Sequence, residues 1–294
     1  QDNKGNIYLA TKNDGVLLIN KEKGVTSRDV VNEVSHILGT KKIGHTGTLD
    51  PIATGVLVLC VGSSLKLVES LMDHDKEYIA TILLGIETDT LDITGEVQRK
   101  ISPKNITRER VMEVLKQFQG KIKQEVPKYS AIKVGGKKLY EYARAGIEVT
   151  LPVHEVEISQ IELIGDIVEN TFQIHVSVSK GTYIRSLVRD IGQALGTVAV
   201  MTDLVRTRVG NFLLQDAILV SDVRAGNYTL LDPRKVLNLP VIVVDDFLLK
   251  KIRNGCVLPS FFSFDKVFVE NSNHELVAIY QQKGNGMVKP YRMF

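Results

Sequence analysis

The pattern of hydrophobic and polar positions predicts strands and helices that follow one another without a regular repeat. Val56–Val61 is an uninterrupted apolar run, which is typical of a strand buried on both faces. Phe172–Val178 alternates strictly between apolar and polar residues, which indicates a strand with one buried face. Two further strands are predicted over 13–20 and 78–84. Because no βαβ repeat is present, we expect an α+β fold on a largely antiparallel sheet rather than a doubly wound parallel one.

Apolar residues recur at helical spacing in several segments, and capping residues mark where these segments begin. Thr26 and Asp29 have the spacing of a capping box, and Gly39 is placed to end the helix that follows them. Thr107 is expected to cap a second helix, which Gly120 ends. The other predicted helices cover 63–72, 184–195 and 245–254.

Two folded units are predicted after a short leading segment. The stretch 226–240 contains two prolines and is a plausible boundary between the units. Beyond it the chain reads as a short helix followed by short strands, with Gly284-Asn285-Gly286 as a hairpin turn. We therefore expect a large unit over 13–235, a small β-rich unit over 236–294, and an extension at 1–12 whose role the sequence does not indicate.

Composition narrows the class of protein. Hydrophobic residues make up 44% of the 294 residues and charged residues 24%, which is enough apolar material for a large core and argues against extended disorder. The longest apolar run is far shorter than the about 18 residues that cross a bilayer. No leader pattern opens the sequence. Cys60 and Cys256 form no CxxC group, which argues against disulfides and zinc and favours a cytoplasmic location.

The distribution of charge is more informative than the net charge of +3. Residues 121–146 contain seven Lys or Arg against two Glu, so this segment alone carries a charge of +5. The same segment contains three tyrosines, and basic groups interleaved with aromatic rings suit an RNA backbone with unstacked bases. A solvated surface explains the composition equally well.

Several familiar catalytic motifs are absent from the sequence. It contains no Walker A loop, no GxSxG elbow and no HExxH helix, and its histidines are scattered. Asp89, Asp92 and Glu96 surround a Thr-Gly pair, but their spacing does not match a calcium loop, so we interpret them as a turn. No metal site is predicted.

Asp50 is the strongest candidate for chemistry. It precedes a proline in the loop 44–51, which contains two glycines and leads to a buried strand. A carboxylate acts as a nucleophile or base in its ionised form, and a nearby guanidinium favours that form. Arg185 and Arg189 lie one turn apart on a predicted helix, away from its apolar face, and Arg185 is a candidate partner for Asp50. An Asp-Pro turn without any chemistry is the common alternative.

The loop sequence resembles the signature of the TruB family of bacterial tRNA pseudouridine synthases. The matching residues are Gly44-His45-Thr46-Gly47-Thr48-Leu49-Asp50-Pro51-Ile52-Ala53-Thr54-Gly55-Val56-Leu57. Three more blocks agree in order and spacing, namely Asn20-Lys21 before Gly24, Asp75-Lys76-Glu77-Tyr78 and Lys180-Gly181-Thr182-Tyr183-Ile184-Arg185. The resemblance is strong over 15–210. From residue 241 onward the resemblance is weaker, and this part of the sequence is similar to the family's small PUA-like domain.

The resemblance implies an isomerase that detaches uracil from its ribose, rotates it and rejoins it through carbon. The substrate would be uridine 55 in the T-loop of tRNA, and no cofactor is implied. Asp50 matches the catalytic carboxylate, which attacks the sugar or the base or removes a sugar proton. Arg185 matches its partner. Tyr78 matches the tyrosine that stacks on the base and is a candidate for a late proton transfer.

The resemblance also implies five substrate-binding residues. Tyr183 matches a second pocket aromatic and Leu204 an apolar wall, although both would serve equally well in a core. His45 matches a histidine that fills the space vacated by the flipped base. Lys21 matches a lysine that supports the active-site loop, and Lys76 lies in the matching block before Tyr78. For His45 and Lys21, a surface or structural role is the alternative.

The segment 121–150 resembles the family's RNA-gripping insertion. A base in a tRNA loop must leave its stack before it can react, and stacking on aromatic side chains offsets the cost. The residues expected to contact the RNA backbone are Lys128, Lys133, Lys137, Lys138 and Arg144. We expect a monomer that binds the T-arm of tRNA, without a membrane and without an obligatory protein partner. The alternatives are a guide-RNA-directed synthase subunit and a non-catalytic tRNA-binding or tRNA-folding module.

Overall fold

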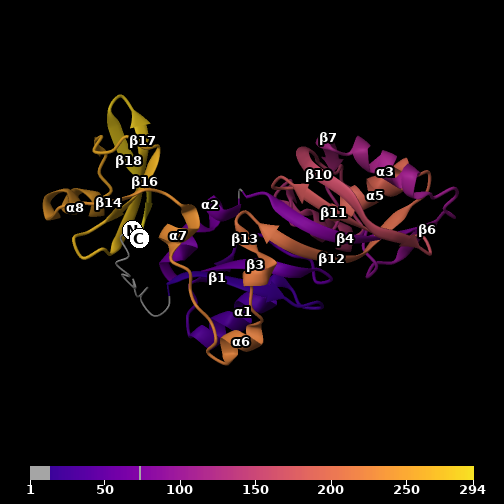
Figure 1. The fold of residues 1–294 in the computed structure, drawn as a ribbon, viewed down its shortest axis with the longest axis horizontal. Coiled ribbons are helices and arrows are strands. Elements are labelled where there is room, and N and C mark those ends of the chain that lie inside the picture. The colour runs from indigo at the N-terminus through magenta and orange to yellow at the C-terminus, as the bar shows by residue number, and fades with distance from the viewer. Residues whose placement is uncertain (1–13, 73) are drawn as a thin grey trace.

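The structure, a computed structural model, describes residues 14–72 and 74–294 and contains two main sheets (Figure 1). The large sheet lies beside helices α3 and α5 at one end of the molecule, and the second sheet lies at the other end. Mixed strands and helices on a mainly antiparallel sheet confirm the expected α+β class. Within the described residues, no helix is long and apolar enough to cross a membrane.

The large sheet has nine strands, and all but one of its pairings are antiparallel. β3 and β12 form the one parallel pair among these strands, next to the edge strand β1. The predicted strand over 13–20 corresponds to β1, with Asn13 outside the described residues. The order along the sheet is β1 (Gly15–Lys21), β3 (Thr54–Val61), β12 (Ala199–Val209), β4 (Lys76–Leu84), β11 (Thr171–Val178), β10 (Val153–Val168) and β7 (Gly120–Glu125), with β2 (Ile43–His45) on β3 and β13 (Phe212–Leu213) on β12.

The apolar run in β3 is buried on both faces, as predicted. Leu57 and Leu59 face one core, which includes Val30 and Val34 of α1 (Ser27–Leu38). The alternate residues of β3 face a second core, which includes Phe268 of the second sheet. Successive strand residues point to opposite faces, so an uninterrupted run is needed where both faces are covered.

Capping residues begin the helices where they were predicted. Thr26 caps α1 with a complete capping box, and Gly39 ends it in the left-handed conformation with φ 64°. Thr107 caps α3 (Arg108–Gln117), but the expected end at Gly120 is wrong. Gly120 opens β7 instead, because the helix closes on Phe118 and the chain turns at once to pair with β10.

The remaining helices are short, apart from α5 (Ile184–Ala194), which the sequence predicted. The helical segment predicted over 63–72 divides into a 3-10 turn, η1 (Gly62–Leu67), and α2 (Val68–Met72). The sequence did not predict the hairpins β5 (Ile86–Thr88) with β6 (Val97–Lys100) and β8 (Lys133–Val134) with β9 (Lys137–Lys138), nor α4 (Leu139–Arg144), η2 (Leu214–Asp216) and α6 (Val220–Arg224).

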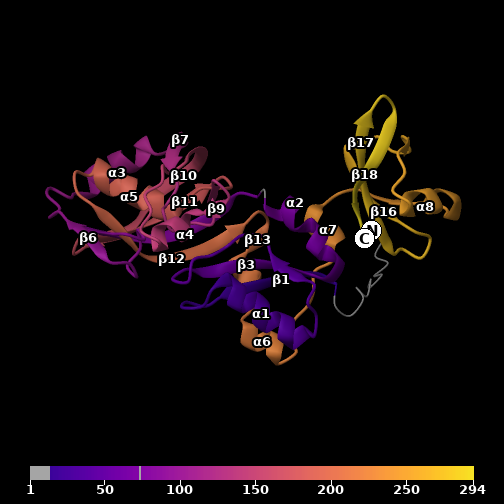
Figure 2. The ribbon, with the colours of Figure 1, turned by 180° about the vertical axis from the view of Figure 1, so that it is seen from behind.

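The second sheet is separate from the large one and shares no strand with it among the described residues (Figure 2). Side chains of the two sheets pack together in the second core. Its strand order is β14 (Val241–Val243), β16 (Lys266–Glu270), β17 (Leu276–Gly284), β18 (Met287–Met293) and β15 (Leu258–Pro259), beside α8 (Asp246–Arg253). The predicted hairpin turn at Gly284-Asn285-Gly286 joins β17 to β18. The stretch before the sheet contains α7 (Pro233–Leu237), and Leu231 pairs with Val16 of β1, which anchors this stretch to the large sheet.

Candidate active site

Asp50 and Arg185 meet in an ion pair at the end of the loop that follows β2. The Asp50 Oδ2 atom lies 2.8 Å from Arg185 Nε, and its Oδ1 atom accepts a hydrogen bond of 3.3 Å from Nη2. The Arg185 side chain is 7% exposed, whereas that of Asp50 is 30% exposed. The arginine is therefore buried behind the carboxylate, and the carboxylate keeps an accessible face.

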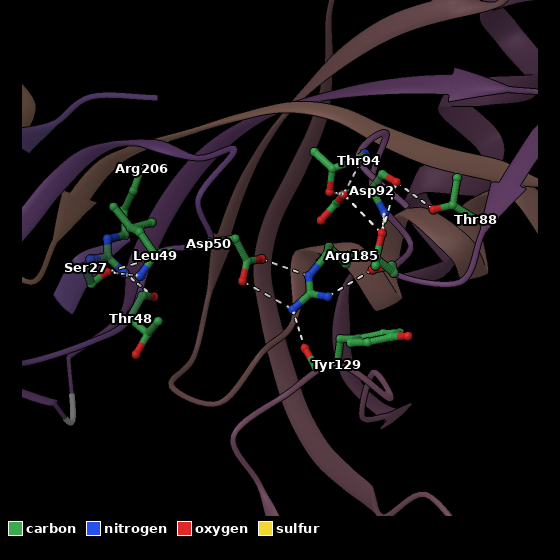
Figure 3. A network of polar contacts seen from close by, with 11 residues as sticks. Ser27, Thr48, Leu49, Asp50, Thr88, Asp92, Thr94, Tyr129, Arg185 and Arg206 are labelled. Atoms are coloured by element: carbon green, nitrogen blue, oxygen red, sulfur yellow. Dashed lines mark hydrogen bonds and ion pairs between the residues drawn. The ribbon is translucent and has the colours of Figure 1, made fainter. Parts of the chain in front are cut away.

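Two backbone carbonyls also bind the guanidinium of Arg185 and hold it in place. Nη1 donates to the Thr90 carbonyl at 2.9 Å, and Nη2 donates to the Tyr129 carbonyl at 3.0 Å (Figure 3). Sequence reasoning placed Arg185 with Arg189 on a helix edge, but only Arg185 reaches the carboxylate. Arg189 pairs with Glu125 instead.

The turn between β5 and β6 supports this arrangement. Asp92 is buried, and its Oδ1 atom accepts hydrogen bonds from the Thr94 N–H at 2.9 Å and from the Thr90 hydroxyl at 3.1 Å. Asp89 also caps this turn through the Glu96 N–H at 2.8 Å. The acidic group is a turn, as the sequence predicted, and it also places the Thr90 carbonyl against Arg185. Within the described part of the chain, no group of three His, Cys, Asp or Glu residues could hold a metal ion.

A cavity of about 620 Å³ opens in front of the Asp50 carboxylate. Six residues predicted for the site line it, namely Asp50, Lys76, Tyr78, Tyr183, Leu204 and Arg185. Tyr78 and Leu204 are buried in the sheet next to it. Burial raises the pKa of the Tyr183 phenol, so this ring enters the cavity as a neutral group. The structure thus brings together residues from β4, α5, β12 and the loop after β2.

Two predicted site residues lie outside this cavity. Lys21 is fully buried beneath the loop, where its Nζ donates to the carbonyls of Val25 at 2.7 Å and Glu22 at 2.9 Å, and more weakly to that of Pro51 at 3.4 Å. His45 lines a separate groove of about 510 Å³ between η1, α2 and β18. Burial lowers the pKa of the His45 imidazole, whose Nδ1 atom is buried and has no hydrogen-bond partner among the described residues.

None of the five basic residues predicted to contact the RNA backbone is part of the cavity lining, but two of them pack on a tyrosine that is. Tyr140 lines the cavity, and both Lys138 and Arg144 lie over its ring, at 5.4 and 5.2 Å from the centroid. Lys133 and Lys137 are exposed on β8 and β9. Lys128 is exposed and lines a second cavity of about 590 Å³ on the other side of Tyr129.

Sequence reasoning missed several residues that build this site. Tyr140 was noted only as part of a basic, aromatic segment, and Met72 as part of a helix, yet both line the cavity. Ser27 is the first residue of α1, and it both donates to and accepts from the Leu49 backbone, at 3.1 and 2.9 Å. Arg206 on β12 donates hydrogen bonds to backbone carbonyls of the same loop. Neither Ser27 nor Arg206 belongs to a recognisable motif, so no signal in one sequence singles them out.

The site and sheet together define a pseudouridine synthase when they are set beside known proteins. The sequence matches the TruB family pseudouridylate synthase N-terminal domain over residues 35–184. It also matches the tRNA pseudouridylate synthase B C-terminal domain over residues 185–237. The chain belongs to the TruB family.

Curated relatives match over almost their whole length. The tRNA pseudouridine synthase B of Bacillus pumilus is 43% identical over 92% of this chain and 93% of that protein. The enzyme of the same name from Bacillus subtilis is 41% identical over 95% of this chain and 97% of that protein. Among solved structures, a Cbf5-Nop10-Gar1 complex covers 96% of this chain and 85% of the matched chain, at 24% identity and a TM-score of 0.69, which supports the fold.

Proposed function

We propose that this chain, a TruB-family enzyme that isomerises uridine to pseudouridine in tRNA, acts at position 55 of the T-loop with Asp50 as its reacting carboxylate. The observation that carries the proposal is the ion pair between Asp50 and a buried Arg185 at the floor of a cavity. The pair supplies an oriented anion where a nucleoside would enter. The reaction rearranges one nucleoside, so its atoms balance without a co-reactant.

The cavity suits a base that has left its stack. Extruding a nucleotide costs a few kcal/mol, and stacking on an aromatic ring returns about 1–3 kcal/mol per base. Tyr78 and Tyr183 both border the cavity, and Leu204 adds an apolar wall. We assign these three side chains to holding the flipped uracil beside Asp50.

Asp50 acts on the bond between uracil N1 and the ribose C1′. The carboxylate attacks the sugar or the base, or removes a sugar proton, and each of these routes requires an oxygen with an available lone pair. Arg185 binds both oxygens of the carboxylate and so fixes the direction of its accessible face. The N1–C1′ bond breaks, the uracil turns, and its C5 atom bonds to C1′. C5 then loses its proton and N1 gains one, so the product is an isomer of the substrate. Tyr78 is our candidate for that late proton transfer.

The charge around the cavity fits a polyanion. Among the described residues, Lys76, Lys180, Arg185 and Arg206 line the cavity, and Asp50 supplies the one carboxylate of its lining. Lys133 and Lys137 extend the positive charge onto the insertion, where Lys138 and Arg144 flank Tyr140. We assign the basic groups of the insertion, with Lys128, to the phosphates of the T-arm, because phosphate contacts position an RNA without reading its sequence.

The guide-RNA alternative is less favoured by the comparisons. Relatives named tRNA pseudouridine synthase B are 40–44% identical to this chain over most of its length. The guide-RNA complex chains are 23–24% identical and therefore support the fold alone. We further propose that the chain acts in the cytoplasm as a monomer, with tRNA as its one obligatory partner.

The decisive experiment incubates the purified chain with an unmodified tRNA transcript and maps any pseudouridine by position. We expect product at position 55, and product elsewhere or none at all would contradict the proposal. Asp50→Asn should bind the transcript with unchanged affinity and lose at least about 10³-fold in rate. Asp265→Asn, a substitution of the same type on the second sheet, should retain full activity. Turnover by Asp50→Asn would refute the assignment of Asp50 as the reacting carboxylate. If Asp50→Asn forms no product but retains the biological activity of the wild type, a tRNA-binding or tRNA-folding module would be favoured.

A further inference from the structure

Arg206 is a buried cation that the proposed chemistry does not use. Its side chain is one of the largest fully buried ones, and the residue is 2% exposed. Among the described residues, no carboxylate lies within ion-pair distance of its guanidinium, whereas Arg185 has Asp50. Burying a charge without a counter-charge is costly. A side chain kept at such a cost calls for a specific explanation.

The partners of Arg206 supply that explanation, since all three are backbone carbonyls of the active-site loop and its flank. Nε donates to Val56 at 2.7 Å, Nη2 to Gly47 at 3.0 Å, and Nη1 more weakly to Thr48 at 3.4 Å. Gly47 and Thr48 precede Asp50, and Val56 follows it. One guanidinium therefore ties the incoming and outgoing arms of the loop that carries the carboxylate.

Every carbonyl from Gly47 to Pro51 is bound by a donor within the protein. Arg206 binds the first two, and Ser27 binds that of Leu49 at 3.1 Å. The Asp50 carbonyl accepts from the Ala53 N–H at 2.9 Å. The Pro51 carbonyl accepts from the Gly24 N–H at 2.7 Å and from Lys21. The loop is irregular, but its carbonyls are as fully satisfied as those of a strand.

Sheet topology makes this arrangement possible. β12 lies between β3 and β4, so Arg206 is opposite Gly55 on one side and Tyr78 on the other. A Cβ atom on Gly55 would come within 2.2 Å of the Arg206 carbonyl oxygen, so glycine allows the close approach of these two strands. Figure 3 shows Arg206 and Arg185 on opposite sides of Asp50. Arg185 fixes the side chain of the carboxylate, and Arg206 fixes its backbone.

We propose that Arg206 is a positioning residue for the isomerisation, which holds the loop backbone so that the Asp50 carboxylate faces both Arg185 and the flipped uracil. The inference rests on the proposed role of Asp50. Arginine suits this role because its planar guanidinium spreads three donor nitrogens over carbonyls on two chain segments, whereas all donors of an ammonium group start from one nitrogen. A displacement of about 1 Å in a reacting group costs on the order of 10²-fold in rate.

The test is Arg206→Lys, which keeps the charge and removes the fork. Single-turnover rates at saturating enzyme are measured together with the Kd for tRNA, because the saturated rate does not depend on the folded fraction. We expect the rate to fall about 10²-fold while the Kd changes less than about threefold. Arg208→Lys, the same substitution two residues along β12 at a residue outside the cavity lining, should match the wild type.

Ser27→Ala provides a second variant in case Arg206→Lys does not fold. It removes both side-chain bonds to Leu49, and we expect a rate loss of about tenfold with an unchanged Kd. A wild-type rate in Arg206→Lys, or in Ser27→Ala where the first variant is unfolded, overturns the inference. A loss of affinity as large as the loss of rate also overturns it, because Arg206 would then serve RNA binding. If Asp50→Asn keeps its activity, both the proposed function and this inference are wrong. If Asp50→Asn is inactive but Arg206→Lys is fully active, only this inference is wrong.

Discussion

The active-site loop and the basic insertion both border the cavity, yet they are built in opposite ways. In the loop, residues 47–51 have every carbonyl bound, and buried side chains from three elements hold them. In the insertion, over 131–150, all of which the structure describes, Leu139 is the one buried residue. Its Tyr142 hydroxyl donates within the insertion, to the Val134 carbonyl.

The difference fits the role that we propose for each region. Bond rearrangement requires a carboxylate held within a fraction of an ångström, so its supports are buried and over-determined. Phosphate binding requires charge of the right sign near a flexible polyanion, which exposed lysines provide without fixed geometry. Substitutions in the loop should therefore change rate at constant affinity, and substitutions in the insertion should change affinity at constant rate.

Among substitutions that leave Asp50 in place, the largest effect is expected from Arg185→Met. The substitution leaves Asp50 without its ion pair and the Thr90 and Tyr129 carbonyls without their donor. We expect single turnover to fall by about 10²–10³-fold, with little change in the Kd for tRNA. Arg189→Met, one turn along the same helix and paired with Glu125 outside the cavity, is the matched control. Equal losses of rate and affinity in Arg185→Met would show that Arg185 also serves tRNA binding. The loop and the insertion would then not differ in the way that we expect.

Sequence reasoning was most successful where the signal is local. The buried strand β3, the capping box at Thr26 and the helix α5 were all predicted, because each depends on spacing within a few residues. The meeting of Asp50 and Arg185 was proposed from the chemistry of the two residue types and the family signature. Local signals single out the groups that we propose to react, but they do not reveal the groups that hold them.

The missed features depend on pairings between distant segments. Arg206 reaches Gly47 across 159 positions of the chain, and only the parallel pairing of β3 with β12 brings them together. β2 is three residues long and forms because β3 offers it an edge, so the expected loop over 44–51 is wrong at Gly44 and His45. Gly120 was assigned to a helix end because its role in β7 depends on pairing with Ile158.

A smaller effect is expected from titrating Lys21 beneath the loop. Burial lowers the pKa of Lys21 from its ordinary 10.5 to about 8. Between pH 8 and 10.5 the unfolded chain therefore binds more protons at this site than the folded chain does, and the unfolding free energy should rise with pH. Below pH 8 the cost of burying the charged amine is fully present. Relative to Lys21→Met, the wild type should gain about 1–3 kcal/mol across this window in urea titrations.

Lys23→Met separates this effect from the titration of ordinary lysines. Lys23 lies two residues further on, is 57% exposed and pairs with Asp203 at the surface. Its substitution should leave the pH dependence of unfolding parallel to that of the wild type. Parallel curves for Lys21→Met and the wild type would show that burying the Lys21 amine carries no cost that depends on pH. In this respect Lys21 would then behave like the exposed lysines of the insertion.

The smallest effect is expected from the insertion, where Lys137→Gln and Lys138→Gln are combined. If both lysines contact phosphates, tRNA affinity should fall, and the slope of log K against log salt should decrease by about 0.7–0.9 per lost contact. The saturated single-turnover rate should stay at the wild-type value, because neither residue lines the cavity. Lys104→Gln with Lys116→Gln removes the same charge near α3, also outside the cavity lining, and should leave the slope unchanged. If the double variant loses rate but keeps its salt slope, these lysines do not bind phosphates. They would then affect the reaction itself, as we expect only of the residues that hold the active-site loop.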